Sequence, residues 1–571
     1  MQGGASPRLK LSGGGILICC MLSADAAVTT QQMRPYRWIK FIPTMDYLIK
    51  NGLIIDGSGK DPVEANIGIK GDRISFVGKA RVDAKEVIDA SGLIVSPGFI
   101  DTHTHSEFTL LADARAEGKI SQGVTTDISG NCGLSAAPLY GEVLEQREAD
   151  LEELGIKERW ATLGEYFSLL EKKGIATNFS TLCGHGNIRG SVIGYKNRRP
   201  DKKEMDEMKR FLSEALQQGA HGFSTGLIYP PGVYSDTDEL IELCKGLNWK
   251  LEIGNWKFVY ASHMRSEGDK LIESIEETIE IGRKTGVHVH ISHIKTSGEH
   301  NWQKIGKVIE LMQMARREGI KLTCDRYPYI ASSTDLDVML PSWVFEGGRN
   351  EGLRRLKDST IREKLKSEFS SKPVDYWKNI HISSVVKDEN KWMEGENIFN
   401  ISQRMGKAIG DAVLDILIDE GLRAGAIFFS MSEENLKRFL SIPYAMVGSD
   451  SSARSFSGIT RNGKPHPRGF GTFPRFLGMY VRDKAIMPLT EAIMKITSLP
   501  AMTFGLEKRG LLRQGFFADI VIFNYDKIID TASFNAPFQK AEGIEYVFVN
   551  GALASNEGNY YTGCLSGRVL R

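Results

Sequence analysis

Between residues 93 and 450, short apolar runs that end in polar residues alternate with helical stretches. Strand followed by helix, repeated eight times, is the sequence pattern of a (β/α)8 TIM-like barrel. In that fold the chemistry lies at the carboxyl ends of the strands, where this chain places His, Cys, Asp, Arg and Tyr residues. The eight runs are LIVSPGFIDTHTH, GVTTDISGNCG, TNFSTLCGHGN, AHGFSTGLIY, KFVYASHMR, GVHVHISHIK, IKLTCDRYPY and YAMVGSD.

The stretches between the runs have helical periodicity. In GDKLIESIEETIEIGRKT, for example, Leu271, Ile272, Ile275 and Ile279 lie on one face. We expect the barrel to span residues 98–500. The stretch between DRYPY and MVGSD is too long for a simple connection, so we expect a lid insertion within about residues 335–430. Extra residues near 247–257 have no explanation in this pattern.

Both ends of the chain are rich in short β-branched runs cut by Gly, Asp and Asn. MDYLIKNGLIIDGSGK opens the first segment, and IEYVFVNGALA lies in the last one. Such runs indicate strands joined by turns. We therefore expect residues 45–97 and 501–571 to form one small, discontinuous β-sandwich domain.

The first 44 residues are treated separately from the fold. Arg8 and Lys10 precede the apolar stretch GGGILICCML, which is a weak secretory signal diluted by glycine. We expect a disordered extension, with Met45 opening the folded protein, and a cytoplasmic location. The alternative is export, with residues 1–26 as a signal peptide.

Composition excludes several classes of partner. A formal net charge of +1 without a long basic run gives no indication of nucleic acid or an anionic membrane surface. No segment has the roughly 20 uninterrupted apolar residues of a membrane span. Seven scattered cysteines, an odd number without a framework, favour a reducing compartment over a disulfide scaffold. The oligomeric state stays open.

His103 and His105 stand at the end of the first run, in Asp-Thr-His-Thr-His. Residues i and i+2 of a strand point to the same face, so both imidazoles project together into the barrel mouth. His-x-His alone is a weak metal signal.

Other strand ends strengthen that signal. They contribute His263 in YASHMR, His293 in HISHIK and Asp450 in MVGSD. Cys132, in Gly-Asn-Cys-Gly, could by itself be a disulfide partner, a nucleophile, a metal ligand or a core residue. Buried structural histidines would explain one of these positions, but not all of them at strand ends.

The motifs together resemble the N-acyl-D-amino-acid deacylases, or D-aminoacylases, of the amidohydrolase superfamily. The resemblance runs from about residue 45 to near the C-terminus, and the Gly-Asn-Cys-Gly and His-Pro-Arg-x-x-Gly-Thr-Phe-Pro-Arg segments are specific to this branch. It implies hydrolysis of the amide of N-acyl-D-amino acids. The motifs are SPGFIDTHTHSE, GVTTDISGNCGLSAAP, GFSTGLIYPPG, ASHMRSE, ISHIKTSG, DRYPY, MVGSD and HPRGFGTFPRFLG.

The resemblance also implies a metal site. Many amidohydrolases carry a bridging carboxylated lysine on strand four; this chain has none there, and Cys132 would take that position. A thiolate suits Zn²⁺. Cys132 and His263 would be the firmest ligands of one tightly held zinc. His103, His105 and His293 would line a second, weaker metal position, and Asp450 would face the metal.

Asp450 is expected to be the catalytic proton acceptor and donor. The resemblance assigns the free α-carboxylate of a small-molecule substrate to Lys295, Tyr327, Ser333 and Arg468. Arg265 and Glu267 are expected to orient ligands, and His185 to shape its loop.

Two other functions remain as alternatives. One is a cyclic-amide hydrolase of the dihydroorotase or hydantoinase kind. The other is a catalytically silent scaffold with the same fold, which should have lost its ligands.

Overall fold

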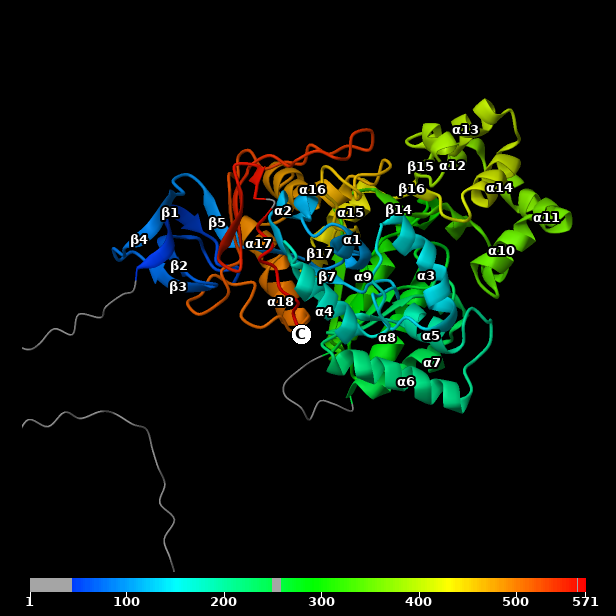
Figure 1. The fold of residues 1–571 in the computed structure, drawn as a ribbon, viewed down its shortest axis with the longest axis horizontal. Coiled ribbons are helices and arrows are strands. Elements are labelled where there is room, and N and C mark those ends of the chain that lie inside the picture. The colour runs from blue at the N-terminus through cyan, green and yellow to red at the C-terminus, as the bar shows by residue number, and fades with distance from the viewer. Residues whose placement is uncertain (1–43, 249–257, 562) are drawn as a thin grey trace, which may run out of the picture. The chain divides into compact units, whose positions relative to one another are not determined.

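A computed structural model places the eight predicted strand runs in two parallel sheets (Figure 1). It describes residues 44–248, 258–561 and 563–571. The predictions for the N-terminal extension and for the insertion near residues 247–257 fall almost wholly outside these residues.

The barrel strands close into a ring. One sheet has the order β6-β7-β8 and the other β17-β13-β12-β11-β10-β9. β8 and β9 are one run interrupted at Leu182, and a parallel bridge between Thr104 and Ser451 joins the two remaining edges. The predicted (β/α)8 barrel is therefore confirmed. Its strands are β6 (Phe99–Asp101), β7 (Val124–Ser129), β8 (Asn178–Thr181), β9 (Cys183–Gly184), β10 (Gly222–Gly226), β11 (Val259–His263), β12 (His288–Ile291), β13 (Leu322–Arg326) and β17 (Ala445–Val447).

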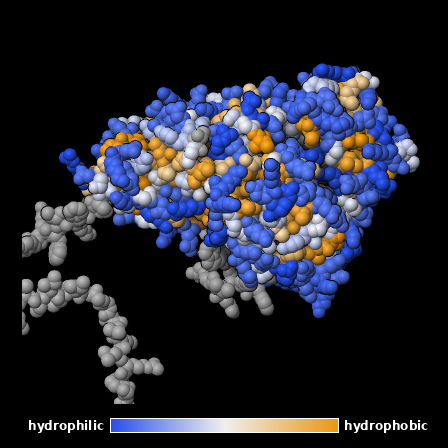
Figure 2. Space-filling model, in the orientation of Figure 1, coloured by the Kyte–Doolittle hydropathy of each residue, from blue (hydrophilic) through white to orange (hydrophobic). Residues whose placement is uncertain are grey.

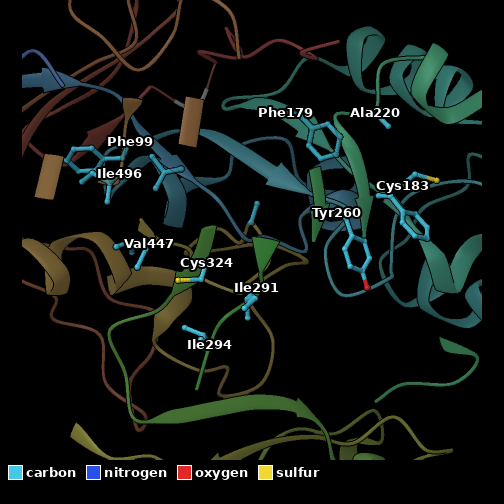
Figure 3. Packing of buried hydrophobic residues seen from close by; sticks show 14 of the residues in the cluster. Phe99, Phe179, Cys183, Ala220, Tyr260, Ile291, Ile294, Cys324, Val447 and Ile496 are labelled. Carbon is cyan, nitrogen blue, oxygen red and sulfur yellow. The ribbon is translucent and has the colours of Figure 1, made fainter. Parts of the chain in front are cut away.

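Helices cover the outside of the barrel, so its strands are buried on both faces. Figure 3 shows strand residues such as Phe99, Phe179, Tyr260 and Ile291 in the resulting core. The helices are α1 (Glu107–Ala112), α2 (Glu117–Ile120), α3 (Gly141–Glu153), α4 (Leu163–Lys173), α5 (His185–Val192), α6 (Lys202–Gln217), α7 (Thr237–Asn248), α8 (Leu271–Thr285), α9 (Ile305–Arg317), α15 (Glu433–Leu440), α16 (Arg468–Arg475), α17 (Leu489–Lys495) and α18 (Ser498–Thr503). Two 3-10 helices, η1 (Gly232–Tyr234) and η2 (Glu299–Lys304), lie between these elements, and η6 (Phe476–Asp483) is a π-helix.

Local sequence explains where the helices begin and end. At the start of α6, Asp201 accepts a hydrogen bond from the Glu204 N–H, and the Glu204 carboxylate accepts one from the Asp201 N–H. This capping box satisfies two otherwise free donors. α8 buries Leu271, Ile275 and Ile279 of the predicted face, whereas Ile272 is only partly buried. The helix ends at Gly286, which has the left-handed conformation.

Strands from both chain ends pair in one sheet beside the barrel. A nine-stranded sheet has the order β21-β20-β19-β18-β5-β1-β2-β3, with β4 paired to β1. The junction between the two chain segments is the antiparallel pairing of β18 with β5. The strands are β1 (Met45–Ile54), β2 (Val63–Lys70), β3 (Arg73–Gly78), β4 (Ala84–Asp89), β5 (Ile94–Pro97), β18 (Ile520–Phe523), β19 (Ile544–Val549), β20 (Ala552–Asn556) and β21 (Asn559–Tyr560).

The long connection after β13 folds as a small α/β unit. Its antiparallel sheet, β14-β16-β15, is packed with helices around a core of its own that includes Leu365, Trp377 and Leu417. Its elements are β14 (Ala331–Asp335), η3 (Leu336–Met339), η4 (Ser342–Phe345), α10 (Arg349–Leu356), α11 (Ser359–Ser370), α12 (Val374–Lys378), β15 (Ile380–Ser384), η5 (Asp388–Met393), α13 (Ile398–Met405), α14 (Ile409–Asp419) and β16 (Gly425–Phe429).

The visible surface is mostly hydrophilic, with hydrophobic side chains in separate groups (Figure 2). Within the described residues, none of the helices has the length and apolar character needed to cross a bilayer. The five cysteines that the structure describes are all free thiols, in agreement with the absence of a disulfide framework in the sequence.

The sheet domain and the barrel share one hydrophobic core, which predicts a large effect for Phe523→Ala. Phe523 of β18 is fully buried, and its ring centroid lies 6.2 Å from that of Phe99 in the first barrel strand. Truncation should lower the free energy of unfolding by about 3–5 kcal/mol in urea denaturation. Val63→Ala, at a position with 55% exposure, should stay within about 0.5 kcal/mol of the parent.

Candidate metal centre and active site

The six predicted metal-site residues lie together at the carboxyl ends of the barrel strands. His103 and His105 follow β6, and Cys132 follows β7. His263 ends β11, His293 follows β12 and Asp450 follows β17. They come from five different strands, and only the closure of the barrel brings them to one place.

The Cys132 sulfur lies at the centre of this cluster. Its Sγ is 3.2 Å from His103 Nε2, 3.3 Å from His293 Nε2 and 3.4 Å from His263 Nδ1. His293 Nε2 and His263 Nδ1 are themselves 3.0 Å apart. One sulfur and three imidazole nitrogens are donor types that Zn²⁺ prefers in proteins.

Asp450 and His105 lie at the edge of the cluster, next to His103. Asp450 Oδ1 is 3.2 Å from His105 Nε2 and 3.5 Å from His103 Nε2. Its other oxygen, Oδ2, lies 2.9 Å from a guanidinium nitrogen of Arg468. The carboxylate of Asp450 thus connects the histidine cluster with an arginine outside it.

Three of these residues have left-handed backbone conformations. φ is +53° at Cys132, +33° at His293 and +51° at Asp450. Non-glycine residues adopt this region rarely and at a cost of about 1–3 kcal/mol, so such strain tends to collect at functional sites. Each of the three bends directly after its strand, which turns the side chain inward over the barrel axis.

The charges of the cluster favour a thiolate. Burial by itself would raise the pKa of the Cys132 thiol, but His103, His293 and His263 outweigh burial and hold that pKa well below its usual value. Burial likewise opposes ionisation of Asp450, yet Arg468 and the histidines keep its pKa well below the ordinary range. Both shifts favour the anionic forms, which are the forms that act as metal ligands.

The donor set fits a zinc-like ion. His103, Cys132, His293 and Asp450 each offer one ligand atom, and these atoms all lie within 4.8 Å of one another. His263, Glu267 and His293 form a second such group. A tetrahedral ion with Zn–N of about 2.0–2.1 Å and Zn–S of about 2.3 Å separates its ligand atoms by roughly 3.4–3.6 Å, close to the spacings found around Cys132.

A buried carboxylate that the sequence analysis did not single out supports these ligands. Asp325 of β13 accepts hydrogen bonds at Oδ2 from His103 Nδ1 (3.1 Å) and His290 Nε2 (2.8 Å). Its Oδ1 accepts from the His293 backbone N–H at 3.0 Å. Fixing Nδ1 of His103 as the donor leaves Nε2 free to face Cys132. The signal was available, because an aspartate inside the apolar run IKLTCDRYPY must have partners when buried.

A buried lysine joins the first and last strands of the barrel. Lys119 Nζ donates to Asp101 Oδ2 at 2.7 Å and to Ser449 Oγ at 2.9 Å, and Asp101 Oδ1 accepts from the Ser449 N–H at 2.7 Å. Asp101 and Ser449 immediately precede the segments that carry His103 and Asp450. This ion pair, also missed from sequence, sets the spacing between those two ends.

The four predicted carboxylate contacts lie next to the cluster. The Lys295 ammonium is 2.8 Å from His293 Nδ1 and also pairs with Glu267 Oε1 at 2.5 Å. Arg468 lies over the Tyr327 ring at 4.7 Å, and the buried Tyr327 hydroxyl has no hydrogen-bond partner among the described residues.

Ser333 contacts this group of residues through its backbone carbonyl. Its carbonyl accepts a hydrogen bond from Arg468 Nη2 at 3.1 Å. Glu267 accepts from Lys295 and lies 2.9 Å from His293 Nδ1, a position that can orient this imidazole. Arg265 instead pairs with Glu277, and His185 with the buried Glu239, away from the Cys132 cluster.

Comparison of the sequence gives one family. The sequence model of the amidohydrolase family matches residues 86–247 and 458–554. The chain is 36% identical over 530 residues to the D-aminoacylase of Alcaligenes xylosoxydans xylosoxydans, which covers 92% of this chain and 97% of that protein. It is 34% identical over 508 residues to the N-acyl-D-glutamate deacylase of the same organism, with 89% and 93% covered.

Comparison of the fold agrees. The structure resembles the crystal structure of N-acyl-D-glutamate deacylase from Bordetella bronchiseptica, complexed with zinc and a phosphonate inhibitor that mimics the tetrahedral intermediate. The TM-score is 0.78 at 32% identity, over 93% of this chain and all of that one.

The backbone around Cys132 leaves no room for a side chain at Gly226, which predicts a specific cost for Gly226→Ala. An added Cβ at this β10 position would lie 2.0 Å from the Cys132 carbonyl oxygen. We expect thermal or urea denaturation to show a loss of about 1–3 kcal/mol. Gly306→Ala, in α9 with nothing within 4 Å of the new methyl, should instead stabilise by up to about 1 kcal/mol. Equal effects of the two substitutions would contradict the packing at Gly226.

Proposed function

Because this chain belongs to the amidohydrolase family, in its D-aminoacylase branch, we propose that it is a zinc-dependent hydrolase of N-acyl-D-amino acids. The products are a carboxylate and a free D-amino acid. One observation carries the proposal: Arg468 contacts Asp450, at the edge of the Cys132 cluster, and the carbonyl of Ser333. A carboxylate-binding guanidinium therefore lies directly beside a metal-type site.

Cys132 and His263 would be the firmest ligands of a tight zinc. His103, His105 and His293 would line a second, weaker position, with Asp450 facing the metal. The 3.4 Å distance between Cys132 Sγ and His263 Nδ1, together with the lowered pKa of the Cys132 thiol, supports these two residues as ligands. A bound zinc ion polarises the amide carbonyl and makes water a better nucleophile near neutral pH.

Asp450 moves the proton in this proposal. One carboxylate oxygen would take a proton from the attacking water and then deliver it to the departing amide nitrogen. The 3.2 Å contact with His105 Nε2 and the 2.9 Å contact with Arg468 hold the carboxylate in one orientation. A fixed carboxylate does not have to reorganise during the reaction.

Arg468, Lys295, Tyr327 and Ser333 would recognise the α-carboxylate of the substrate. Arg468 and Lys295 supply positive charge, and both are almost fully buried, so that charge is weakly screened. The Tyr327 hydroxyl, which has no partner in the described part of the chain, is available as a further donor. Tyr327 and Arg468 come from different elements but stack on each other, which fixes the direction of the guanidinium.

We further propose that the protein acts in the cytoplasm. The five described cysteines are free, and three of them, Cys183, Cys244 and Cys324, are buried. Such thiols are compatible with a reducing compartment.

Amine release from matched N-acetyl-D- and N-acetyl-L-amino acids (Met, Leu, Phe, Glu) tests the function. The zinc-supplemented protein would be assayed beside dihydroorotate and hydantoin. Hydrolysis of the D-forms alone supports a deacylase, and the ranking of side chains defines its preference. Turnover of only the cyclic amides would replace the proposal by a cyclic-amide hydrolase. Zinc binding without any turnover would mean that the metal site is intact and that the substrate lies outside this set, whereas a silent scaffold should bind no zinc.

Asp450→Asn removes the proton acceptor and changes little of the volume of the site. We expect turnover of the preferred N-acetyl-D-amino acid to fall by about 10²–10⁴-fold, with zinc content retained. Zinc analysis and steady-state kinetics on the same preparation check both parts. Asp269→Asn, at an exposed carboxylate that pairs with His300, is the control and should leave kcat unchanged. Preserved activity of the Asp450 variant would refute its role.

The pH dependence of activity should respond to Arg468. This cation is the largest of the influences that lower the Asp450 pKa against the effect of burial. In Arg468→Met that pKa rises, and because the base must be ionised, the acid limb of the kcat/KM profile should move to higher pH. Arg354→Met, at an exposed arginine, serves as the control. An unshifted acid limb would argue against contact between Arg468 and the catalytic base.

A further inference from the structure

We propose that His466 is a positioning residue for the substrate carboxylate: it fixes Arg468 and strand β14 relative to each other, so that the guanidinium is held ready for the ligand. The inference rests on the proposed function, and it assigns a role to the histidine of the His-Pro-Arg motif. Among the described residues, no hydrogen bond joins His466 to the Cys132 cluster or to Asp450, so His466 would act only through Arg468.

Both ring nitrogens of His466 are used. Nδ1 accepts a hydrogen bond from the backbone N–H of Arg468 at 3.0 Å. Nε2 is 3.0 Å from the carbonyl oxygen of Ala331, the first residue of β14. Two residues further along β14, the Ser333 carbonyl accepts from Arg468 Nη2. The His466 ring and the Arg468 guanidinium thus each hydrogen-bond to a carbonyl of β14, and together they connect the start of α16 to this strand.

The geometry allows only one protonation state. A backbone N–H can only donate, so Nδ1 must be the acceptor and carry no proton. Nε2 then carries the hydrogen and donates to the Ala331 carbonyl. Protonation of Nδ1 would place two hydrogens between the ring and Arg468, and the imidazole therefore stays neutral while it performs this role.

Aromatic rings close the site around the imidazole. The ring of His466 lies edge-on to Tyr329 at 5.0 Å and to Phe534 at 4.9 Å, and the residue is 3% exposed. Phe534 belongs to the connection between β18 and β19 of the small domain. With water excluded by these rings, a lost hydrogen bond is not replaced by solvent.

The consequence of losing His466 is a displaced guanidinium. Arg468 has to reach Asp450 with one nitrogen and the Ser333 carbonyl with the other. Bidentate recognition of a carboxylate depends on the plane of the guanidinium, so a small shift weakens substrate binding more than the chemical step.

Three substitutions separate the two hydrogen bonds. His466→Leu removes both, whereas the oxygen of His466→Asn lies near the place of Nδ1 and keeps an acceptor for the Arg468 N–H. The amide of His466→Gln reaches toward the place of Nε2 and keeps a donor for Ala331. For the preferred N-acetyl-D-amino acid, we expect His466→Leu to raise KM about 10–100-fold. Its kcat should change by less than about threefold, with unchanged zinc content.

The expected rescue is graded. His466→Asn should recover most of the KM, because its bond is the direct one to Arg468, and His466→Gln should recover less. The substrate's carboxamide analogue, which lacks the charge read by Arg468, should show no change of KM in any variant. His381→Leu is the matched control, because this histidine also lies near a backbone carbonyl (3.2 Å) and an aromatic ring but belongs to β15.

An unchanged KM in His466→Leu would overturn the inference, as would a lower kcat at constant KM. If the leucine variant does not fold, the asparagine and glutamine variants still test the inference. It would be overturned if both had the same KM, raised about 10–100-fold over the wild type. Calorimetric binding of the same N-acetyl-D-amino acid in the Asp450→Asn background measures the carboxylate contact without turnover. Failure of the proposed function is distinct, because it would appear as absent hydrolysis by the wild type. The inference would also be overturned if the Asp450→Asn variant with an intact His466 did not bind the N-acetyl-D-amino acid.

Discussion

The convergence of three imidazoles on the Cys132 sulfur is the interaction on which the site depends. Burying a thiolate and several histidines costs free energy unless each polar atom finds a partner. The barrel meets that cost with a surrounding layer of fixed charges. Asp325 accepts from His103, His290 and the His293 backbone, while Glu267 lies between Lys295 and His293. Asp325 fixes Nε2 of His103, and Glu267 and Lys295 next to Nδ1 of His293 leave its Nε2 for the sulfur.

The rest of the molecule keeps this cluster at the barrel mouth. The pair of Lys119 with Asp101 joins the first strand end to the last, and the left-handed residues Cys132, His293 and Asp450 turn their side chains inward. The inserted sheet contributes the carbonyl of Ala331, which bonds to His466, and the carbonyl of Ser333, which bonds to Arg468. The small domain contributes Phe534, which packs on His466. Substrate recognition is thus assembled from the barrel, the insertion and the small domain, whereas the metal-type cluster belongs to the barrel alone.

Much of the fold could be read from the chain because its signals are local. Each of the eight apolar runs carries its own strand pattern, and α6 and α8 carry capping and periodicity signals within a few residues. The histidines could be found because i and i+2 placement in His103-Thr-His105 is also local. Asp325 and Lys119 were missed for the opposite reason. Their meaning lies in partners more than a strand away, His103 and Asp101, and nothing in their immediate neighbours announces those partners.

The sequence by itself determined the alternation of strands and helices, the strand-rich character of both chain ends, and the polar residues at the strand ends. These follow from periodicity and turn chemistry, which act over a few residues. Tertiary structure alone decided that the Cys132 sulfur faces three imidazoles, that Arg468 touches Asp450, and that His466 ties Arg468 to β14. Such distances depend on strand order, barrel closure and the packing of an insertion, and these join residues up to hundreds of positions apart.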